Sequence, residues 1–148
     1  MRALIQRVSS ASISIEGTPG GTIGAGYVIL LGVGHDDDEA TVRKLWEKVR
    51  KLRIFQDAEG KPNLSLEDVG GDALIVSQFT LYANCRRGNR PSYTDAGKPD
   101  EAERLYEAFV EMARADLTHV ETGEFGADMA VQLVNDGPFT IWLDTDEL

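Results

Sequence analysis

Two short runs in this chain carry residues whose types could do chemistry. The first is Ser77-Gln78-Phe79-Thr80, which directly follows the apolar run 73–76. Where a strand ends, backbone N–H groups and polar side chains leave the ladder of hydrogen bonds and can face a ligand. The Phe79 ring could cap a pocket there or stack on a nucleobase. A polar strand edge with no chemical role is the alternative interpretation.

The second run contains Gly137-Pro138, between Asn135 and Thr140, with apolar, β-favouring residues on both sides. Proline cannot donate a ladder hydrogen bond, and glycine lets the backbone approach another group closely. A turn between two strands would explain the pair, because Asn-Asp-Gly-Pro is favourable turn chemistry. The pair therefore predicts either a turn or a backbone segment that meets another group.

Several common catalytic sets are missing. The chain has no Gly-x-Ser-x-Gly nucleophile elbow, and its two histidines, His35 and His119, lie in no recognised motif. It has no spacing typical of a zinc site and no glycine-rich phosphate loop, so we expect no metal and no cofactor. Thr80 could act as a nucleophile, but no histidine or lysine lies near it in the sequence to activate its hydroxyl.

The composition is that of a single domain over residues 1–148. A chain of this length can bury about two-thirds of its unfolded surface. The single cysteine, Cys85, excludes an internal disulfide framework, and no apolar stretch approaches the ~18 residues of a membrane span. The N-terminal residues become polar too early for a secretory signal. We therefore expect a cytoplasmic protein with no membrane partner.

The formal net charge of −10 argues against a general nucleic-acid-binding protein, and no DNA partner is expected. The basic groups are concentrated in residues 43–90, which hold ten basic and six acidic side chains. Residues 91–148 hold three basic and fourteen acidic ones. One face of the molecule could therefore meet phosphates. A solvated helix face next to a charged loop is the alternative.

Hydrophobic periodicity predicts a mixed α/β fold with more strands than helices. One helix follows the acidic run 36–39 and carries an apolar stripe as far as Leu52, and another begins near Asp100. A long polar loop is expected over 84–99. Strands are predicted over residues 2–9, 11–16, 27–31, 73–76, 119–124, 128–134 and 139–144, with a hairpin connection at 17–21 and a loop at 57–63. The fold class is α/β, a single layered domain with largely antiparallel β-sheets packed by two main helices.

Together, the runs Ser77–Thr80 and Asn135–Thr140 resemble the two signature motifs of the D-aminoacyl-tRNA deacylase family, also called D-tyrosyl-tRNA deacylases. The resemblance covers essentially the whole chain. Its other segments are Ala3–Val8, Arg53–Phe55, Asp57–Lys61, Gly88–Ser92 and Thr122–Phe125. The sequence departs from the family pattern at Arg87, where lysine is common, at Tyr93, where phenylalanine is common, and at Phe139, where valine is frequent. Each departure keeps charge or apolar character.

The resemblance implies a homodimer with the layered deacylase fold, which hydrolyses the ester between a D-amino acid and the 3′-terminal adenosine of tRNA. Gly137-Pro138, with a cis peptide bond, would reach into the partner's pocket and act as a chirality gate, a backbone wall that excludes L-amino acids. Main-chain atoms suit this task because they cannot rotate away as a side chain can. Glycine has no side chain to exclude, so glycyl-tRNA should also fit.

The resemblance also implies the roles of individual residues. The catalytic segment is Ser77, Gln78, Phe79 and Thr80, in which backbone N–H groups around Phe79 and Thr80 hold the oxyanion. The ribose 2′-hydroxyl of the substrate would help to activate water, which fits the missing general base, and attack by Thr80 stays open. The implied substrate-binding residues are Phe125 and Met129 at the terminal adenine, together with Asn135 and Thr140. Core positions are the alternative for Phe125 and Met129.

The uneven charge distribution fits a tRNA substrate. We expect the first helix and the arginine-rich loop to contact acceptor-stem phosphates, which gives affinity with little sequence preference. The side chains concerned are Lys44, Lys48, Lys51, Arg86, Arg87 and Arg90. Two other functions stay open: a non-catalytic dimeric tRNA-binding module, supported by the absence of a recognisable general base, and a small-molecule ester hydrolase of the same fold.

Overall fold

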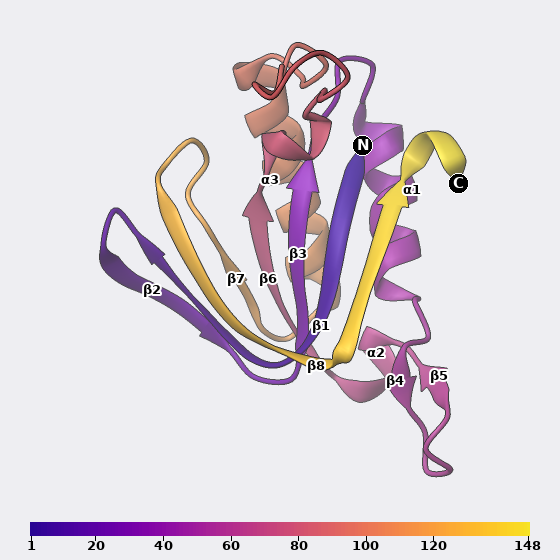
Figure 1. Ribbon diagram of the computed structural model, residues 1–148. Helices are drawn as coiled ribbons and strands as arrows, with labels where there is room; N and C mark the ends of the chain where they lie inside the picture. The colour runs from indigo at the N-terminus through magenta and orange to yellow at the C-terminus, as the bar shows by residue number, and fades with distance from the viewer.

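The computed structural model describes residues 1–148 as a single domain with a strongly bent six-stranded sheet (Figure 1). Two helices, α1 (Glu39–Arg50) and α3 (Pro99–Asp116), contact each other and cover one face of the sheet. A short helix, α2 (Leu66–Val69), is an addition that the sequence pattern does not predict. The predicted class, a mixed α/β domain with a mostly antiparallel sheet, is confirmed.

Strand β1 (Arg2–Ile15) organises the sheet because it pairs with three neighbours. Its first half is antiparallel to β3 (Gly26–Gly32), and its second half is antiparallel to β2 (Thr18–Ile23). Strand β8 (Met129–Asp144) runs antiparallel along the whole of β1, with register shifts on both sides of Val8. Such irregularities bend a strand and increase its twist, so the paired strands β1 and β8 curve together with the bent sheet.

Two strands of the sheet run parallel to their neighbours. Strand β6 (Asp72–Ser77) is parallel to β3, and β7 (Val120–Thr122) is parallel to β6. Parallel neighbours need a long crossover connection, and α1 and α3 lie in these connections. Leu31 pairs with Ser77, so the carboxyl ends of β3 and β6 meet at one edge. The 3-10 turn η1 (Phe79–Tyr82) follows directly at that edge.

Two apolar clusters hold the layers together. The larger lies between the sheet and the helices, where the rings of Trp46 and Phe109 meet edge-on with centroids 5.4 Å apart. The smaller lies on the other face, where β2 and the second half of β1 curl over Val28 and Leu74. The predicted apolar stripe of the first helix is confirmed, since its buried residues are Val42, Leu45, Trp46 and Val49. The Asp38 side chain caps this helix by accepting from the amide of Thr41 at 2.9 Å.

The structure corrects the predicted strand boundaries. The predicted strands 2–9 and 11–16 are parts of one strand, which ends at Ile15, because the irregularity at Val8 bends β1 without ending it. The predicted strands 128–134 and 139–144 are likewise parts of β8, which begins at Met129, although residues 136–139 have no partner on β1. Gly137-Pro138 therefore lies inside a strand, and the interpretation as a turn is wrong.

The loops differ from expectation in smaller ways. The hairpin connection is shorter than 17–21, since Glu16 and Gly17 make the turn with φ values of 49° and 77°. The predicted loop at 57–63 is the tip of a small hairpin formed by β4 (Phe55–Gln56) and β5 (Pro62–Leu64). The polar segment after η1 has no helix or strand until α3 begins at Pro99. The chain ends in a 3-10 turn, η2 (Thr145–Glu147), and none of its helices has the length and apolar character to span a membrane.

Candidate active site

A pocket of about 500 Å³ opens where β3 and β6 end. Three of the predicted catalytic residues, Ser77, Gln78 and Phe79, line it, and so does Phe125. Its other walls come from the end of β3, the polar loop before α3, the first turn of α3 and the segment around Phe125; they are Leu31, Val33, His35, Tyr93, Thr94, Ala96, Gly97, Lys98, Pro99, Ala102, Tyr106 and Gly126. The pocket is largely apolar and aromatic with few polar groups, as ligand sites commonly are.

The turn η1 presents backbone amides beside this pocket. The amide of Gln78 is bound to Leu31 O at 2.7 Å, and the amides of Leu81 and Ala83 are bound to Gln78 O and Thr80 O. The amides of Phe79 and Thr80 stand at the start of the turn, where N–H groups have no acceptor within it. The Gln78 side-chain amide donates to Thr80 Oγ1 at 2.5 Å. Two backbone N–H groups without a hydrogen-bond acceptor therefore lie next to each other beside the pocket.

Aromatic rings flank the pocket. The ring of Phe79 is 57% exposed and meets the Tyr93 ring edge-on, with centroids 5.0 Å apart. Phe125 packs beside Tyr106, with ring centroids 6.1 Å apart. Met129 does not line the pocket; it is half-buried against the smaller core cluster. The structure therefore brings Phe125, and not Met129, to the predicted catalytic segment.

The second run is built around a buried arginine. The peptide bond Gly137-Pro138 is cis, as the resemblance implies, and both residues are exposed. Arg7 Nε donates to Asp136 O at 3.1 Å, Arg7 Nη1 donates to Ile54 O, and the guanidinium lies 4.8 Å from the centroid of the Phe139 ring. A buried charge needs such partners, and here they fix the backbone on both sides of Gly137.

Asn135 and Thr140 brace the same segment. Asn135 Nδ2 donates to Gln6 Oε1 at 2.7 Å and to Thr140 Oγ1 at 3.0 Å, and its Oδ1 accepts from the amide of Phe139 at 2.8 Å. Both side chains therefore lie beside Gly137-Pro138 and away from the pocket of the same chain. Their hydrogen bonds position the backbone of residues 135–140.

The two runs contact opposite ends of the first half of β1. Leu81, in η1, is bound by Arg2 at the start of β1, whereas Asp136 is bound by Arg7. Five residues of strand separate these two anchors, which corresponds to about 17 Å. A single chain does not bring the catalytic segment and Gly137-Pro138 together.

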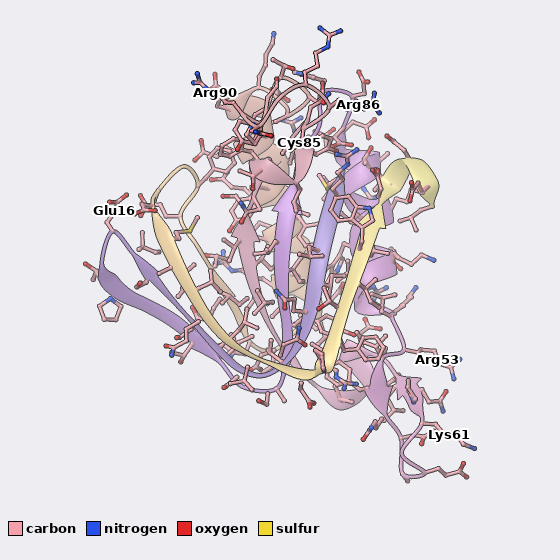
Figure 2. The ribbon with its side chains drawn as sticks, viewed as in Figure 1. Glu16, Arg53, Lys61, Cys85, Arg86 and Arg90 are labelled. Carbon is pink, nitrogen blue, oxygen red and sulfur yellow. The ribbon has the colours of Figure 1, made fainter.

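The predicted phosphate-binding residues divide into two groups. Lys44 Nζ donates to the carbonyls of Thr145 and Leu148 at 2.9 and 2.8 Å, and Lys51 is paired with Glu47 at 2.6 Å. The other four side chains are exposed and without an ion pair; they are Lys48, Arg86, Arg87 and Arg90. Figure 2 shows Arg86 and Arg90 on the loop that crowns the end of the sheet where the pocket opens.

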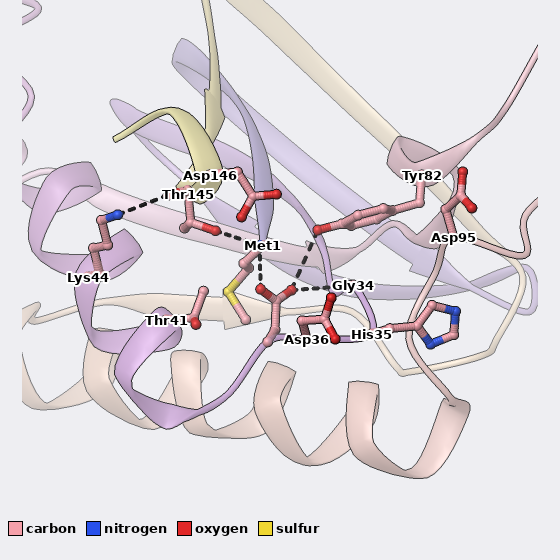
Figure 3. A pocket seen from close by; sticks show the side chains of 11 residues that line it. Met1, Gly34, His35, Asp36, Thr41, Lys44, Tyr82, Asp95, Thr145 and Asp146 are labelled. Carbon is pink, nitrogen blue, oxygen red and sulfur yellow. Dashed lines mark hydrogen bonds and ion pairs between the residues drawn. The ribbon is translucent and has the colours of Figure 1, made fainter.

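A second, polar pocket of about 490 Å³ shares His35 with the first, and Figure 3 shows the side chains that line it. Asp37 Oδ1 accepts from the Met1 amine at 2.5 Å, and Asp37 Oδ2 accepts from the amide of Gly34 at 2.6 Å. Burial and the neighbouring Asp37 carboxylate raise the pKa of the Tyr82 phenol, which keeps it neutral. No group of three or more His, Cys, Asp or Glu side chains is arranged to hold a metal ion.

Sequence reasoning missed Arg7 and His35. Arg7 falls on the same alternating face of β1 as the buried residues Ala3 and Ile5, so a charged residue at an inward position was the available signal. His35 follows β3 and lines both pockets, with its Nε2 2.6 Å from Thr94 O. Nothing in the sequence links it to the polar loop.

Comparison with known proteins agrees with this geometry. A family model described as D-Tyr-tRNA(Tyr) deacylase matches residues 4–144. A D-aminoacyl-tRNA deacylase of Thermomicrobium roseum is 57% identical over 148 residues, which cover 100% of this chain and 96% of that protein. The D-aminoacyl-tRNA deacylase of Lactobacillus helveticus is 55% identical over 144 residues, covering 97% and 99%.

Solved structures show the same fold. The c-Myc DNA unwinding element binding protein superposes with a TM-score of 0.92 at 37% identity, over 97% of this chain and 98% of that one. A probable eukaryotic D-amino acid tRNA deacylase gives a TM-score of 0.86 at 17% identity, over 96% and 97%, and shows likeness of fold alone. The matches place the chain among hydrolases that remove acyl groups, the enzyme class predicted from its sequence. It belongs to the D-Tyr-tRNA(Tyr) deacylase family, and the resemblance carried by its two motifs is confirmed.

The contacts around Gly137 predict the effect of a side chain there. Gly137 has a φ of 136°, and a Cβ would lie 3.0 Å from Phe139 N and 3.2 Å from Arg7 Nη2. We expect Gly137→Ala to lower the free energy of unfolding, measured by urea denaturation, by about 1–3 kcal/mol. Gly60→Ala is the matched control, because Gly60 also has a positive φ but no neighbour within 4 Å. Equal losses in the two variants would contradict a role for the Arg7 and Phe139 contacts.

Proposed function

We propose that this protein hydrolyses the ester between a D-amino acid, or glycine, and the 3′-terminal adenosine of tRNA, and that it spares L-aminoacyl-tRNA. The observation that carries the proposal is the pair of free amides at Phe79 and Thr80 beside an aromatic pocket of about 500 Å³. Membership of the deacylase family supports the same reaction. Aminoacyl-tRNA is used in translation, so the cytoplasm is the expected location.

The active unit is a homodimer in which each chain supplies the chirality gate to its partner. The distance of about 17 Å between the two runs within one chain supports this arrangement. So does the exposure of Gly137 and Pro138 at a position fixed by Arg7 and Asn135. A rigid, exposed backbone segment with no role in its own pocket is suited to complete the pocket of a second copy.

Selection of the D form then follows from exclusion. A fixed backbone wall beside the α-carbon clashes with an L side chain and leaves room for a D side chain. Gly137 keeps that wall free of a side chain, and the three groups anchored by Arg7 prevent it from moving. Glycine has no side chain to clash, so the same wall accepts glycyl-tRNA.

Catalysis needs an activated water and a stabilised oxyanion. The amides of Phe79 and Thr80 are suited to bind the oxyanion, because preorganised donors act where the charge develops. No histidine, lysine or carboxylate contacts Thr80, whose Oγ1 accepts from Gln78, so its hydroxyl lacks a base. The 2′-hydroxyl of the terminal ribose is adjacent to the ester and helps to activate the attacking water in place of a side-chain base.

The rest of the substrate has matching surfaces. Phe125 lines the pocket and is suited to contact the terminal adenine, whereas Asn135 and Thr140 support the backbone beside Gly137-Pro138. Met129 packs against the smaller core cluster. The exposed arginines 86, 87 and 90 and Lys48 are suited to contact acceptor-stem phosphates. Lys44 and Lys51 must first leave their present partners to do so.

Deacylation assays with three substrates test the reaction itself. We expect the wild-type protein to release D-tyrosine and glycine from tRNA and to leave L-tyrosyl-tRNA intact at the same enzyme concentration. Equal rates on D- and L-tyrosyl-tRNA would refute the chirality gate. Binding of charged tRNA without faster ester loss would instead indicate a non-catalytic tRNA-binding module, and cleavage of a free D-aminoacyl ester at the same rate would indicate a small-molecule hydrolase.

Substitution of Thr80 separates the two chemical mechanisms. We expect Thr80→Ala to keep kcat within about tenfold of the wild type, because the residue contributes its backbone amide, whereas loss of an essential nucleophile costs far more. D-tyrosyl-tRNA that ends in 2′-deoxyadenosine should be almost inert with both proteins. Complete loss of activity in a folded Thr80→Ala variant that still binds tRNA would favour attack by Thr80.

Charge reversal tests the phosphate contacts. Each lost contact weakens binding most at low salt, so we expect Lys48→Glu combined with Arg87→Glu to raise KM for D-tyrosyl-tRNA about tenfold in dilute buffer, with kcat kept. Arg114→Glu is the control, since Arg114 is exposed on α3 and pairs only with Glu111. An unchanged KM at low salt would show that these two residues do not meet the tRNA.

A further inference from the structure

Arg2 joins the catalytic segment to the end of β8. Its Nη1 donates to Leu81 O at 3.0 Å, and its Nε donates to Asp144 Oδ2 at 2.8 Å. The guanidinium carbon lies 4.3 Å from the centroid of the Tyr82 ring and 5.7 Å from that of Trp142. One side chain therefore contacts two consecutive residues of η1 and two residues of the strand that carries Gly137-Pro138.

These contacts are placed to hold η1 still. A 3-10 turn of four residues has poor hydrogen-bond geometry of its own. On its other side the turn packs closely on β3, since a Cβ at Gly32 would lie 3.1 Å from both Gln78 O and the Leu81 side chain. Arg2 is the residue of β1 that pairs with Gly32. The turn is thus held between a close backbone contact and the Arg2 guanidinium.

The Arg2–Asp144 pair is well shielded. The Asp144 side chain is only 9% exposed and that of Arg2 30% exposed. Burial acts to raise the pKa of Asp144, but the Arg2 hydrogen bond and the amide of Asp146 outweigh it, so the pKa lies below its usual value. A charge-assisted hydrogen bond in such a setting has a fixed geometry. Because the guanidinium is rigid and planar, the hydrogen bond to Asp144 also fixes the direction from which Arg2 binds the Leu81 carbonyl.

We propose that Arg2 is a positioning residue for the deacylation reaction: it fixes η1 so that the amides of Phe79 and Thr80 point at the developing oxyanion. The inference rests on the proposed function of that segment. Arg2 does not line the pocket; it acts through Leu81 and Tyr82. Because misplacing a donor by a fraction of an ångström weakens transition-state binding more than substrate binding, Arg2 affects kcat and not KM.

Two measurements on the same variants test this role. We expect Arg2→Ala to lower kcat for D-tyrosyl-tRNA about tenfold with KM within about twofold of the wild type. Hydrogen exchange at the amides of Phe79 and Thr80 should become about tenfold faster, because local opening of η1 is no longer opposed. Arg2→Lys keeps the charge but not the planar fork, so it should recover only part of kcat.

Controls distinguish positioning from general loss of stability. Arg104→Ala removes another ion-paired arginine, bound to Glu39 and Glu101, and should leave kcat and the exchange of both amides unchanged. If Arg2→Ala does not fold, Asp144→Asn takes its place, and we expect it to lower kcat and speed exchange in the same direction. Unchanged kcat and exchange in folded Arg2→Ala or Asp144→Asn, or equal losses in Arg104→Ala, would overturn the inference. If the Arg2 or Asp144 variant speeds exchange at both amides but the wild-type protein cleaves no D-aminoacyl-tRNA, the proposed function is refuted, whereas the role of Arg2 in holding η1 is kept.

Discussion

The long pairing of β1 with β8 is the constraint on which both parts of the candidate site depend. Arg2 and Arg7 project from one strand, and each binds a different functional run, Leu81 in η1 and Asp136 beside Gly137. The ladder therefore fixes the distance between the two runs. The register shifts around Val8 leave residues 136–139 without a partner on β1, so the position of Gly137-Pro138 is set by the paired residues on either side and by the contacts of Arg7 and Asn135.

The site contains few of the side chains that usually do ester chemistry. Its donors are main-chain amides, its walls are aromatic rings, and Thr80 has a glutamine for a neighbour and no base. Such a site depends on accurate backbone placement, because main-chain donors cannot adjust by changing rotamer. Arg2 holds the backbone of η1 beside the pocket, and Arg7 holds the backbone beside Gly137.

The sequence predicted the elements that have a strong local signal. The stripe of Val42, Leu45, Trp46 and Val49 and the apolar run before Ser77 lie where periodicity put them. The sequence left a turn open as the alternative at Gly137-Pro138, because the pairing of the flanking residues with β1, which keeps the segment within β8, is a long-range contact. The roles of Arg2 and Arg7 were missed for the same reason, since their partners are 79 and 129 residues away.

The separation of Phe79 and Thr80 from Gly137-Pro138 has a consequence for fidelity. Under the proposed arrangement, in which a second copy supplies the gate, a dissociated chain would keep the amides of Phe79 and Thr80 and lose the wall that rejects L substrates. Dissociation follows mass action, so accuracy and speed would respond differently to dilution. Discrimination between mirror-image substrates would then depend on protein concentration, and a cell that makes too little of the protein would lose selectivity before it loses chemistry.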